Sequence, residues 1–319
     1  MGDRTAKSPV IVALVLGIGL VAAPFMFQMF TRAPMGAEMI DGFRPYMTSE
    51  QVTLFQGHLA TIEAANTEAI VLLRPSIISS GYTDGPGYDA QFSSAVGLSD
   101  AWPAINDDMG DLLVRMENNI SNYEAVDALP SFDLFPWFFV LPGLIIAGLA
   151  GWTLVTIRRS GAASRRQLLA IIAMGLAVVA APAIFQMFTR APKGGDMIND
   201  FRPIMTRDRV LAVQSYFITI GGAEGQYRVA MLPLDAEIRG VPESQLAGDY
   251  PALTELSQTW PVILTDFAPM ISTMSDNVEN FAAVDALPPF PLFPWFFVVP
   301  GLLVAGAGIV ALRDTNSRR

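Results

Sequence analysis

Four long apolar segments without ionisable residues constrain this chain more than any other feature. They are residues 9–30, 134–157, 168–188 and 292–312, and none contains Asp, Glu, Lys, Arg or His. A helix needs about 20 consecutive apolar residues to cross the hydrocarbon core of a bilayer. Charged residues make up only 16% of the chain, whereas soluble domains carry about a quarter. The sequence therefore predicts an all-α integral membrane protein with four transmembrane helices.

The sequence is internally duplicated with an offset of 158 residues. Residues 21–48 and 179–206 are identical at 20 of 28 positions, and residues 122–144 and 280–302 are identical at 18 of 23. Each copy has the order span, long segment, span, so the two copies have the same orientation. We therefore predict parallel repeats related by a pseudo-two-fold axis along the membrane normal.

The domain boundaries follow from this duplication. Repeat 1 is predicted to cover residues 1–159, with an extracytoplasmic helical domain at 33–133 between spans 9–30 and 134–157. Repeat 2 is predicted to cover residues 160–319, and its parts are a span at 168–188, a helical domain at 191–291 and a span at 292–312.

Apolar residues in both long segments recur at helical spacing, which predicts two helices in each. The first stripe is Val52, Phe55, Leu59 and Ile62 in repeat 1, and Val210, Val213, Phe217 and Ile220 in repeat 2. The second stripe is Trp102, Ile105, Met109, Leu112, Met116 and Ile120, matched by Trp260, Ile263, Phe267, Met270, Met274 and Val278. Thr48 and Thr206 stand where N-caps of the first helices are expected.

Arg32 and Arg190 stand at the outer ends of two spans, whereas nine basic residues gather beside the spans on the other side of the membrane. These nine are Arg4, Lys7, Arg158, Arg159, Arg165, Arg166, Arg313, Arg318 and Arg319. Because cytoplasmic segments carry such an excess, both termini are predicted to be cytoplasmic and both long segments extracytoplasmic. Only two of the 20 basic residues are Lys, which together with abundant Ala and Gly is typical of a GC-rich bacterial genome. We expect a multi-pass protein of the bacterial cytoplasmic membrane.

Several classes of function are excluded or disfavoured by what the sequence lacks. It has no Cys and one His, so disulfides, thiolate metal sites and poly-His metal sites cannot form. The net charge of −10 argues against a nucleic-acid partner. Spans without ionisable residues argue against proton or ion coupling. The protein is predicted to be no enzyme and to use no cofactor or metal.

Two repeated aromatic motifs mark the outer ends of the spans. FQMFTRAP occurs at 27–34 and 185–192, and FPWFF occurs at 135–139 and 293–297. One interpretation is interfacial anchoring, because Trp is enriched at membrane surfaces. A second is a lipid or ligand crevice, in which Arg meets a phosphate and aromatic rings line an acyl path. A third is a groove for a partner helix. The candidate crevice residues are Gln28, Arg32, Trp137, Gln186, Arg190 and Trp295.

Other features have structural interpretations. Gly143, Ala147 and Gly151 are spaced as a small-residue ladder that allows two helices to approach closely. Asp127 and Asp285 recur in AVDALP, where each would end a helix or pair with Arg. The candidate structural ion pairs involve Arg44, Asp127, Arg202 and Asp285, with Arg32 and Arg190 as alternative partners. His58 is interpreted as packing against aromatic side chains. The acidic cluster of Asp107, Asp108 and Asp111 is interpreted as a solvated face.

These observations favour a non-enzymatic accessory or scaffold subunit of a bacterial cell-envelope membrane complex. Its expected partners are the lipid bilayer and a membrane or envelope protein, which would bind the divergent parts of the extracytoplasmic domains. The alternative is a lipid- or hydrophobe-binding component of a transport system that uses the Arg and aromatic crevice. An envelope enzyme is the third interpretation, for which the sequence names no catalytic group. The sequence leaves the oligomeric state open.

Overall fold

The computed structural model describes residues 7–81 and 85–316, so Arg4, Arg318 and Arg319 lie outside the described residues. All regular structure within those ranges is helical, which confirms the predicted all-α fold. The helices are α1 (Lys7–Met26), α2 (Met29–Phe43), α3 (Ser49–Glu68), η1 (Ala69–Leu73), α4 (Arg74–Ser79), α5 (Pro86–Gln91), α6 (Ser93–Asp127), η2 (Phe132–Leu134), α7 (Phe135–Ser160), α8 (Arg165–Ile184), α9 (Met187–Phe201), α10 (Arg207–Gln226), η3 (Tyr227–Met231), α11 (Leu232–Arg239), α12 (Glu243–Asp249), α13 (Pro251–Asp276), α14 (Val278–Asp285), η4 (Phe290–Leu292) and α15 (Phe293–Asn316).

The chain divides into two compact units, and each takes segments from both halves of the sequence. The membrane unit comprises the described residues of 1–41, 121–200 and 279–319. The helical unit comprises the described residues of 42–120 and 201–278.

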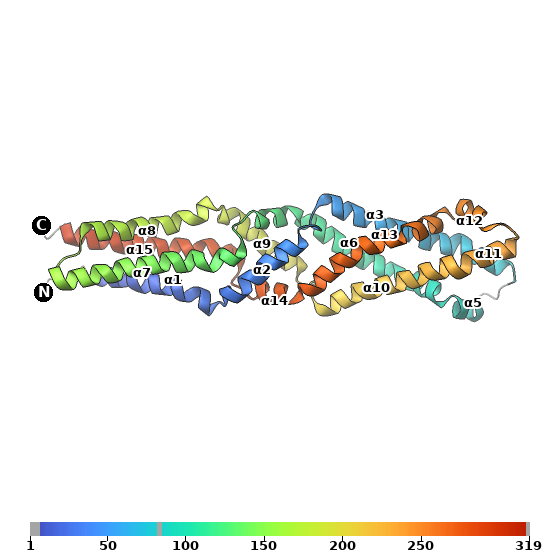
Figure 1. Ribbon diagram of the computed structural model, residues 1–319, viewed down its shortest axis with the longest axis horizontal. Coiled ribbons are helices and arrows are strands. Elements are labelled where there is room, and N and C mark those ends of the chain that lie inside the picture. The colour runs from blue at the N-terminus through green and yellow to red at the C-terminus, as the bar shows by residue number, and fades with distance from the viewer. Residues whose placement is uncertain (1–6, 82–84, 317–319) are drawn as a thin grey trace. The chain divides into compact units, whose positions relative to one another are not determined.

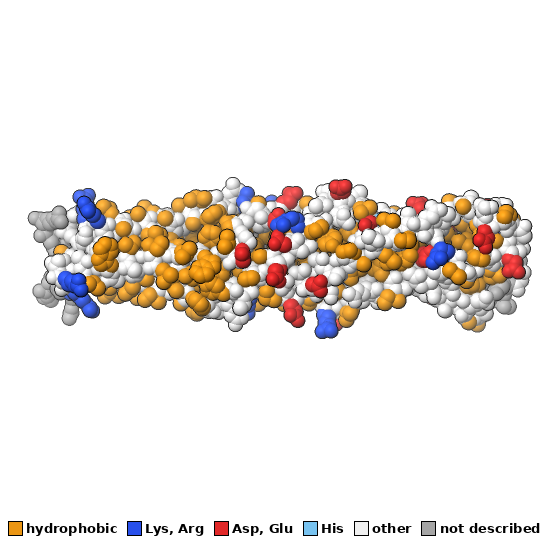
Figure 2. Space-filling model, viewed as in Figure 1, with side chains coloured by type: hydrophobic (Ala, Val, Ile, Leu, Met, Phe, Trp, Pro, Cys, Tyr) orange, Lys and Arg blue, Asp and Glu red, His pale blue; other side chains and the backbone are white. Residues whose placement is uncertain are grey.

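Four helices of the membrane unit are long and apolar enough to cross a membrane, namely Lys7–Met26, Phe132–Ser160, Arg165–Ile184 and Phe290–Asn316. Figure 1 shows α1, α7, α8 and α15 running side by side, with α1 against α7 and α8 against α15. Large apolar side chains cover their outer faces, and Val15 and Leu176 are 61% and 53% exposed. Figure 2 shows hydrophobic side chains over these helices and Lys and Arg side chains at one of their ends. Such a surface is suited to the hydrocarbon of a lipid bilayer.

Glycines allow the spanning helices to touch through their backbones. A Cβ atom on Gly17 would lie 2.7 Å from the backbone N of Ala147, and one on Gly175 would lie 2.7 Å from the backbone N of Ala305. Small residues at such contacts are the usual means of close helix packing in membranes. The ladder is shorter than its spacing predicts, because a Cβ on Gly151 would meet nothing within 4 Å.

The helices α1 and α8 each end at a sharp backbone break inside the two FQMFTRAP sequences. Gln28 and Gln186 both have φ of +54°, which is rare for a residue with a side chain. The next helix starts at once, because the backbone N–H of Arg32 donates to the carbonyl of Gln28 at 3.0 Å. The N–H of Arg190 donates to the carbonyl of Gln186 at the same distance. The helix that starts at Lys7 therefore ends at Met26, and the expected span at 9–30 includes this break.

The helical unit buries most residues of the predicted apolar stripes, whereas Ile120, Phe217 and Val278 are only partly buried. Phe55, Ile62, Ile263 and Phe267 are each fully buried. Figure 1 shows α3, α6, α10 and α13 as the long helices of this unit. Thr48 caps α3 by accepting a hydrogen bond from the backbone N–H of Gln51 at 3.2 Å, as predicted. Thr206 caps α10 in the same way through Arg209 at 3.3 Å.

The turns and short helices that follow α3 and α10 were not predicted from helical periodicity. Two π-helical turns, η1 and η3, follow α3 and α10, and they begin at residues 69 and 227, which are 158 residues apart. Short helices then build the connections to α6 and α13, namely α4 and α5 in repeat 1, and α11 and α12 in repeat 2. A π-turn inserts one residue into a helix and so rotates the face that follows it.

Candidate functional site

A column of paired phenylalanines runs through the membrane unit where α7 and α15 begin. Phe139 and Phe297 have ring centroids 4.4 Å apart, and Phe135 and Phe293 are 4.9 Å apart. A third pair, Phe132 and Phe290, is 6.0 Å apart. The two members of every pair are 158 residues apart in the sequence. Rings at these distances attract one another beyond simple burial, so the column joins the two halves of the chain.

Arg32 and Arg190 each bind a backbone carbonyl of the other half of the chain. Arg32 Nη1 donates to the carbonyl of Ala286 at 2.8 Å, and Arg190 Nη1 donates to the carbonyl of Ala128 at 2.6 Å. Each of these carbonyls follows the last residue of a helix, α14 or α6, where backbone acceptors lack helical partners. A guanidinium has five N–H groups, so each Arg retains donors for another ligand.

The other four candidate crevice residues are exposed, and they lie near the same ends of the spanning helices as Arg32 and Arg190. Trp137 is 47% exposed and its ring meets Phe30 edge to face at 5.5 Å. Trp295 is 52% exposed and meets Phe188 in the same way at 5.9 Å. Gln28 and Gln186 are exposed at the helix breaks. This surface fits interfacial anchoring, and its binding of a ligand stays a prediction.

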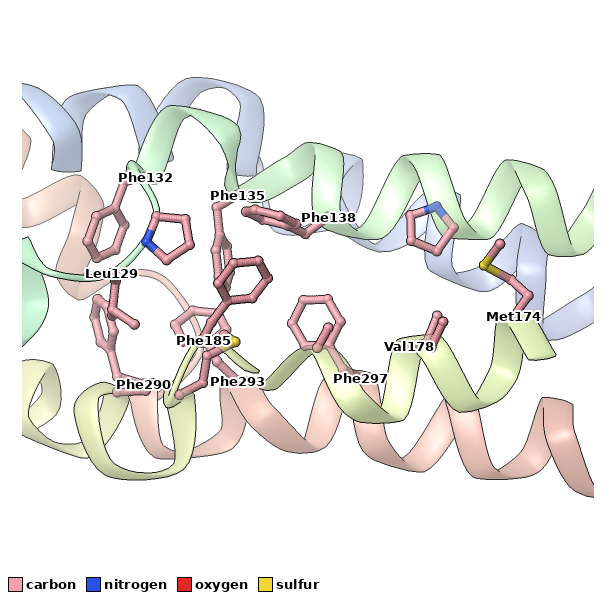
Figure 3. Close-up of a pocket in the computed structure, with 16 residues that line it drawn as sticks. Leu129, Phe132, Phe135, Phe138, Met174, Val178, Phe185, Phe290, Phe293 and Phe297 are labelled. Atoms are coloured by element: carbon pink, nitrogen blue, oxygen red, sulfur yellow. The ribbon is translucent and has the colours of Figure 1, made fainter. Parts of the chain in front are cut away.

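A cavity of about 150 Å³ lies beside the phenylalanine column and was missed by the sequence analysis. All 16 residues that line it are apolar. Figure 3 shows Phe135, Phe138, Phe293, Phe297 and Val178 around this space. Its lining comes from α7, α8, α9, α15 and the segments before α7 and α15, so no single stretch of sequence could have indicated it.

The four predicted ion-pair residues stand next to helix ends. Asp127 and Asp285 are the last residues of α6 and α14. Arg44 and Arg202 lie in the turns that follow α2 and α9. Ion pairing among these four residues remains a prediction.

Polar side chains of the helical unit form contacts between the two halves of the chain. His58 Nε2 lies 2.8 Å from Asp266 Oδ2, and the hydroxyl of Tyr216 donates to Asp108, which also pairs with Arg209. Residues 58 and 216 correspond under the 158-residue offset, and so do residues 108 and 266. Of the predicted acidic cluster, Asp108 thus has a structural role, and His58 has a polar partner besides its contact with Phe267. Burial, followed by the hydrogen bond to Asp108, raises the pKa of Tyr216.

Each half of the chain also caps a helix of the other half. Glu68 Oε2 accepts a hydrogen bond from the backbone N–H of Leu253 at 2.8 Å. Gln226 Oε1 accepts one from the backbone N–H of Ala95 at 2.9 Å. Both N–H groups belong to the first turns of long helices, α13 and α6, where backbone donors lack helical partners.

One buried polar network is centred on Asp235 and joins both halves of the chain. Asp235 is fully buried and accepts hydrogen bonds from Ser76 at 2.5 Å, Tyr250 at 2.9 Å and Arg239 at 3.2 Å. Position 77, its counterpart in repeat 1, is a fully buried Ile. Burial raises the pKa of Tyr250. The network is satisfied internally, so it serves packing and offers no open ligand site.

The described part of the chain contains no group of three or more His, Asp or Glu side chains that could hold a metal ion. No protein-family model matches this sequence, and no curated protein sequence matches it significantly. The apolar cavity and the exposed apolar faces are therefore the features on which a function can be argued.

Proposed function

We propose that this protein is a non-enzymatic accessory or scaffold subunit of a membrane complex in a bacterial cell envelope. The observation that carries the proposal is an exposed apolar stripe in the helical unit, whose described residues include no helix long and apolar enough to cross a membrane. Leu211, Ile218 and Val229 are 52%, 76% and 67% exposed. A spacing of seven residues returns to nearly the same face of a helix, so Leu211 and Ile218 form one stripe along α10, and Val229 is exposed on the π-helical turn η3 that follows. Exposed apolar patches on such units mark interaction surfaces.

The proposed arrangement is two parallel repeats about a pseudo-two-fold axis, with the helical unit outside the cytoplasm. The reciprocal bonds of Arg32 and Arg190 support this symmetry, as does the column of counterpart phenylalanines. The topology is supported by the basic linker between α7 and α8.

The stripe on α10 is specific to repeat 2 and favours one partner site in each molecule, whereas Val229 has an exposed counterpart, Val71, in repeat 1. Thr53 and Ala60 stand at the repeat 1 positions that correspond to Leu211 and Ile218. A symmetrical surface would bind two identical partners, whereas this surface presents its stripe on one side only. A narrow apolar stripe on a helix fits the apolar face of a helix from a neighbouring protein. Figure 2 shows hydrophobic side chains on the drawn face of this unit, over α10 and α13.

The test replaces the stripe and measures the assembly. Leu211→Ser with Ile218→Ser is compared with Thr53→Ser and Ala60→Ser, and each full-length protein is extracted gently from its own membrane for native mass spectrometry. We expect a stoichiometric protein partner with the wild type and with the repeat 1 variant, and its loss with the stripe variant. A partner that the stripe variant retains, or a wild-type chain without one, would refute the proposal.

The alternative function, lipid or hydrophobe binding in a transport system, draws its support from Arg32 and Arg190. Their guanidinium groups keep free N–H donors at the level of the exposed Trp137 and Trp295. Under this alternative, Arg32→Ala with Arg190→Ala would abolish co-purification of a lipid while the protein partner stays bound.

A further inference from the structure

We propose that the cavity beside α7 and α8 binds one acyl chain of a membrane phospholipid by its upper part, which is the part nearest the headgroup. This inference does not depend on the protein partner proposed above. It adds a site and a ligand class to a protein whose spans already require a bilayer.

The shape of the cavity points toward the lipid side. Its floor is formed by buried side chains, including Phe293, Phe297 and Val178, which are 2%, 3% and 4% exposed. Its rim includes Phe138 and Phe185, which are only partly buried. These two rings belong to α7 and to the residue after α8, and their centroids are 5.3 Å apart. Rings at this distance contact one another, so they would part when a chain enters sideways between α7 and α8 from the surrounding hydrocarbon.

The lining selects an apolar guest. Every lining residue is apolar, whereas a buried water needs about two to four polar partners. A volume of about 150 Å³ accommodates a guest about the size of benzene or a short stretch of an acyl chain. Water is therefore a poor occupant and hydrocarbon a good one.

The position of the cavity sets which part of the chain would occupy it. From Phe135 to Pro142, both in the lining, α7 advances seven residues, a rise of about 10 Å from the start of the span. On α8 the lining reaches Met174, ten residues before the end of that helix, so the cavity extends from beside the headgroups to a depth of about 15 Å. Arg190 directly precedes the lining residue Ala191, and it bonds the carbonyl that precedes the lining residue Leu129. Its remaining N–H donors stand where a phospholipid phosphate would lie.

The two repeats differ at the floor of this site. Val178 corresponds to Leu20 in α1, and both side chains are buried. The smaller side chain on α8 contributes space that the larger one on α1 would occupy. A ring placed at position 178 would fill the same space.

The test uses photolabelling of the full-length protein in vesicles. The vesicles contain phosphatidylcholine and phosphatidylglycerol, with a small fraction of phosphatidylglycerol that carries a diazirine on the upper part of one acyl chain. After irradiation, adducts are mapped by mass spectrometry. We expect adducts on Phe293 and Phe297, whose burial hides them from lipids that only surround the protein, as well as on the exposed Leu176. Adducts confined to exposed residues would overturn the proposal, whatever the variants do.

Two variants and two further probes sharpen the result. Val178→Phe should remove the adducts on Phe293 and Phe297, whereas Leu176→Phe, on the lipid-facing side of the same helix, should leave them. A diazirine at the end of the acyl chain should label these two rings less than the upper-chain probe. Labelling of both rings by a diazirine alkane, but not by the phospholipid, would overturn the assignment to a phospholipid chain.

Discussion

The carboxylate of Glu68 accepts a hydrogen bond from the backbone N–H of Leu253, which lies 185 residues further along the chain. The counterpart pair, Gln226 and Ala95, makes the same bond with a neutral amide. Two residues of different charge thus perform one task in the two halves. The shared requirement is an acceptor at the start of a long helix, and the negative charge of Glu68 adds a favourable interaction with the dipole of α13.

Replacement of Glu68 should therefore separate the hydrogen bond from the charge. We expect Glu68→Ala to lower the free energy of unfolding by about 1–3 kcal/mol, because it leaves a partly buried N–H without its acceptor. Glu68→Gln should keep most of the stability, since Gln226 already makes this bond. Chemical denaturation in detergent, followed by circular dichroism, measures both. Equal losses in the two variants would show that charge, and not the acceptor, matters.

A second prediction concerns the backbone contact between α1 and α7. Gly17→Ala should lower the thermal unfolding midpoint, because its Cβ would lie 2.7 Å from a backbone atom that cannot move alone. Gly19→Ala is the matched control on the same helix, since its Cβ would meet nothing within 4 Å. Thermal unfolding in one detergent compares them. An equal midpoint in both variants would contradict the close packing of α1 and α7.

A third prediction concerns the core of the helical unit. Phe267 is fully buried, and its ring lies 4.4 Å from that of Phe55 and 4.9 Å from that of Phe217. Phe267→Ala should cost about 3–5 kcal/mol of unfolding free energy, because it removes this burial and leaves a cavity. The exposed Val262→Ala on the same helix should change stability little. Chemical denaturation of both variants measures the free energy of unfolding. A small loss of this free energy in Phe267→Ala would mean that this core is loosely packed.

The parts of the fold that sequence could predict are those with a local signal. The apolar spans have no ionisable residues, and the stripe residues Phe55 and Ile263 recur at helical spacing. Thr48 and Thr206 are capping residues at the positions where α3 and α10 begin. Each of these signals lies within about 20 residues of sequence, so it does not depend on how distant segments meet.

The remaining features depend on contacts between distant segments. Glu68 gives no local sign that it will cap Leu253, and the phenylalanines of FPWFF give no sign of pairing with their own counterparts. The cavity needs Phe138 and Val178 to be placed by different helices. The break at Gln28 was missed because Gln has no special preference for positive φ. Only the three-dimensional arrangement identifies these features.

The last prediction concerns alkaline pH. Tyr227 is buried in η3, and burial raises the pKa of its hydroxyl well above the usual value, with a smaller contribution from Tyr88. In the unfolded chain the hydroxyl ionises near pH 10, whereas in the folded chain it stays protonated to higher pH. The contribution of Tyr227 to stability is therefore fully present below about pH 10 and decreases as the pH rises toward the folded value.

Tyr227→Phe should make the stability less sensitive to alkaline pH. The wild type should lose up to about 1.4 kcal/mol of unfolding free energy per pH unit above pH 10 for each such tyrosine, and Tyr216 and Tyr250, whose pKa values are also raised, add to the slope. The variant should show a smaller slope between pH 10 and 12, while its stability at pH 7 provides the reference for lost packing. Denaturation curves at both ends of this range measure the slope. If the two proteins lose stability in parallel, the hydroxyl of Tyr227 is not held neutral by burial.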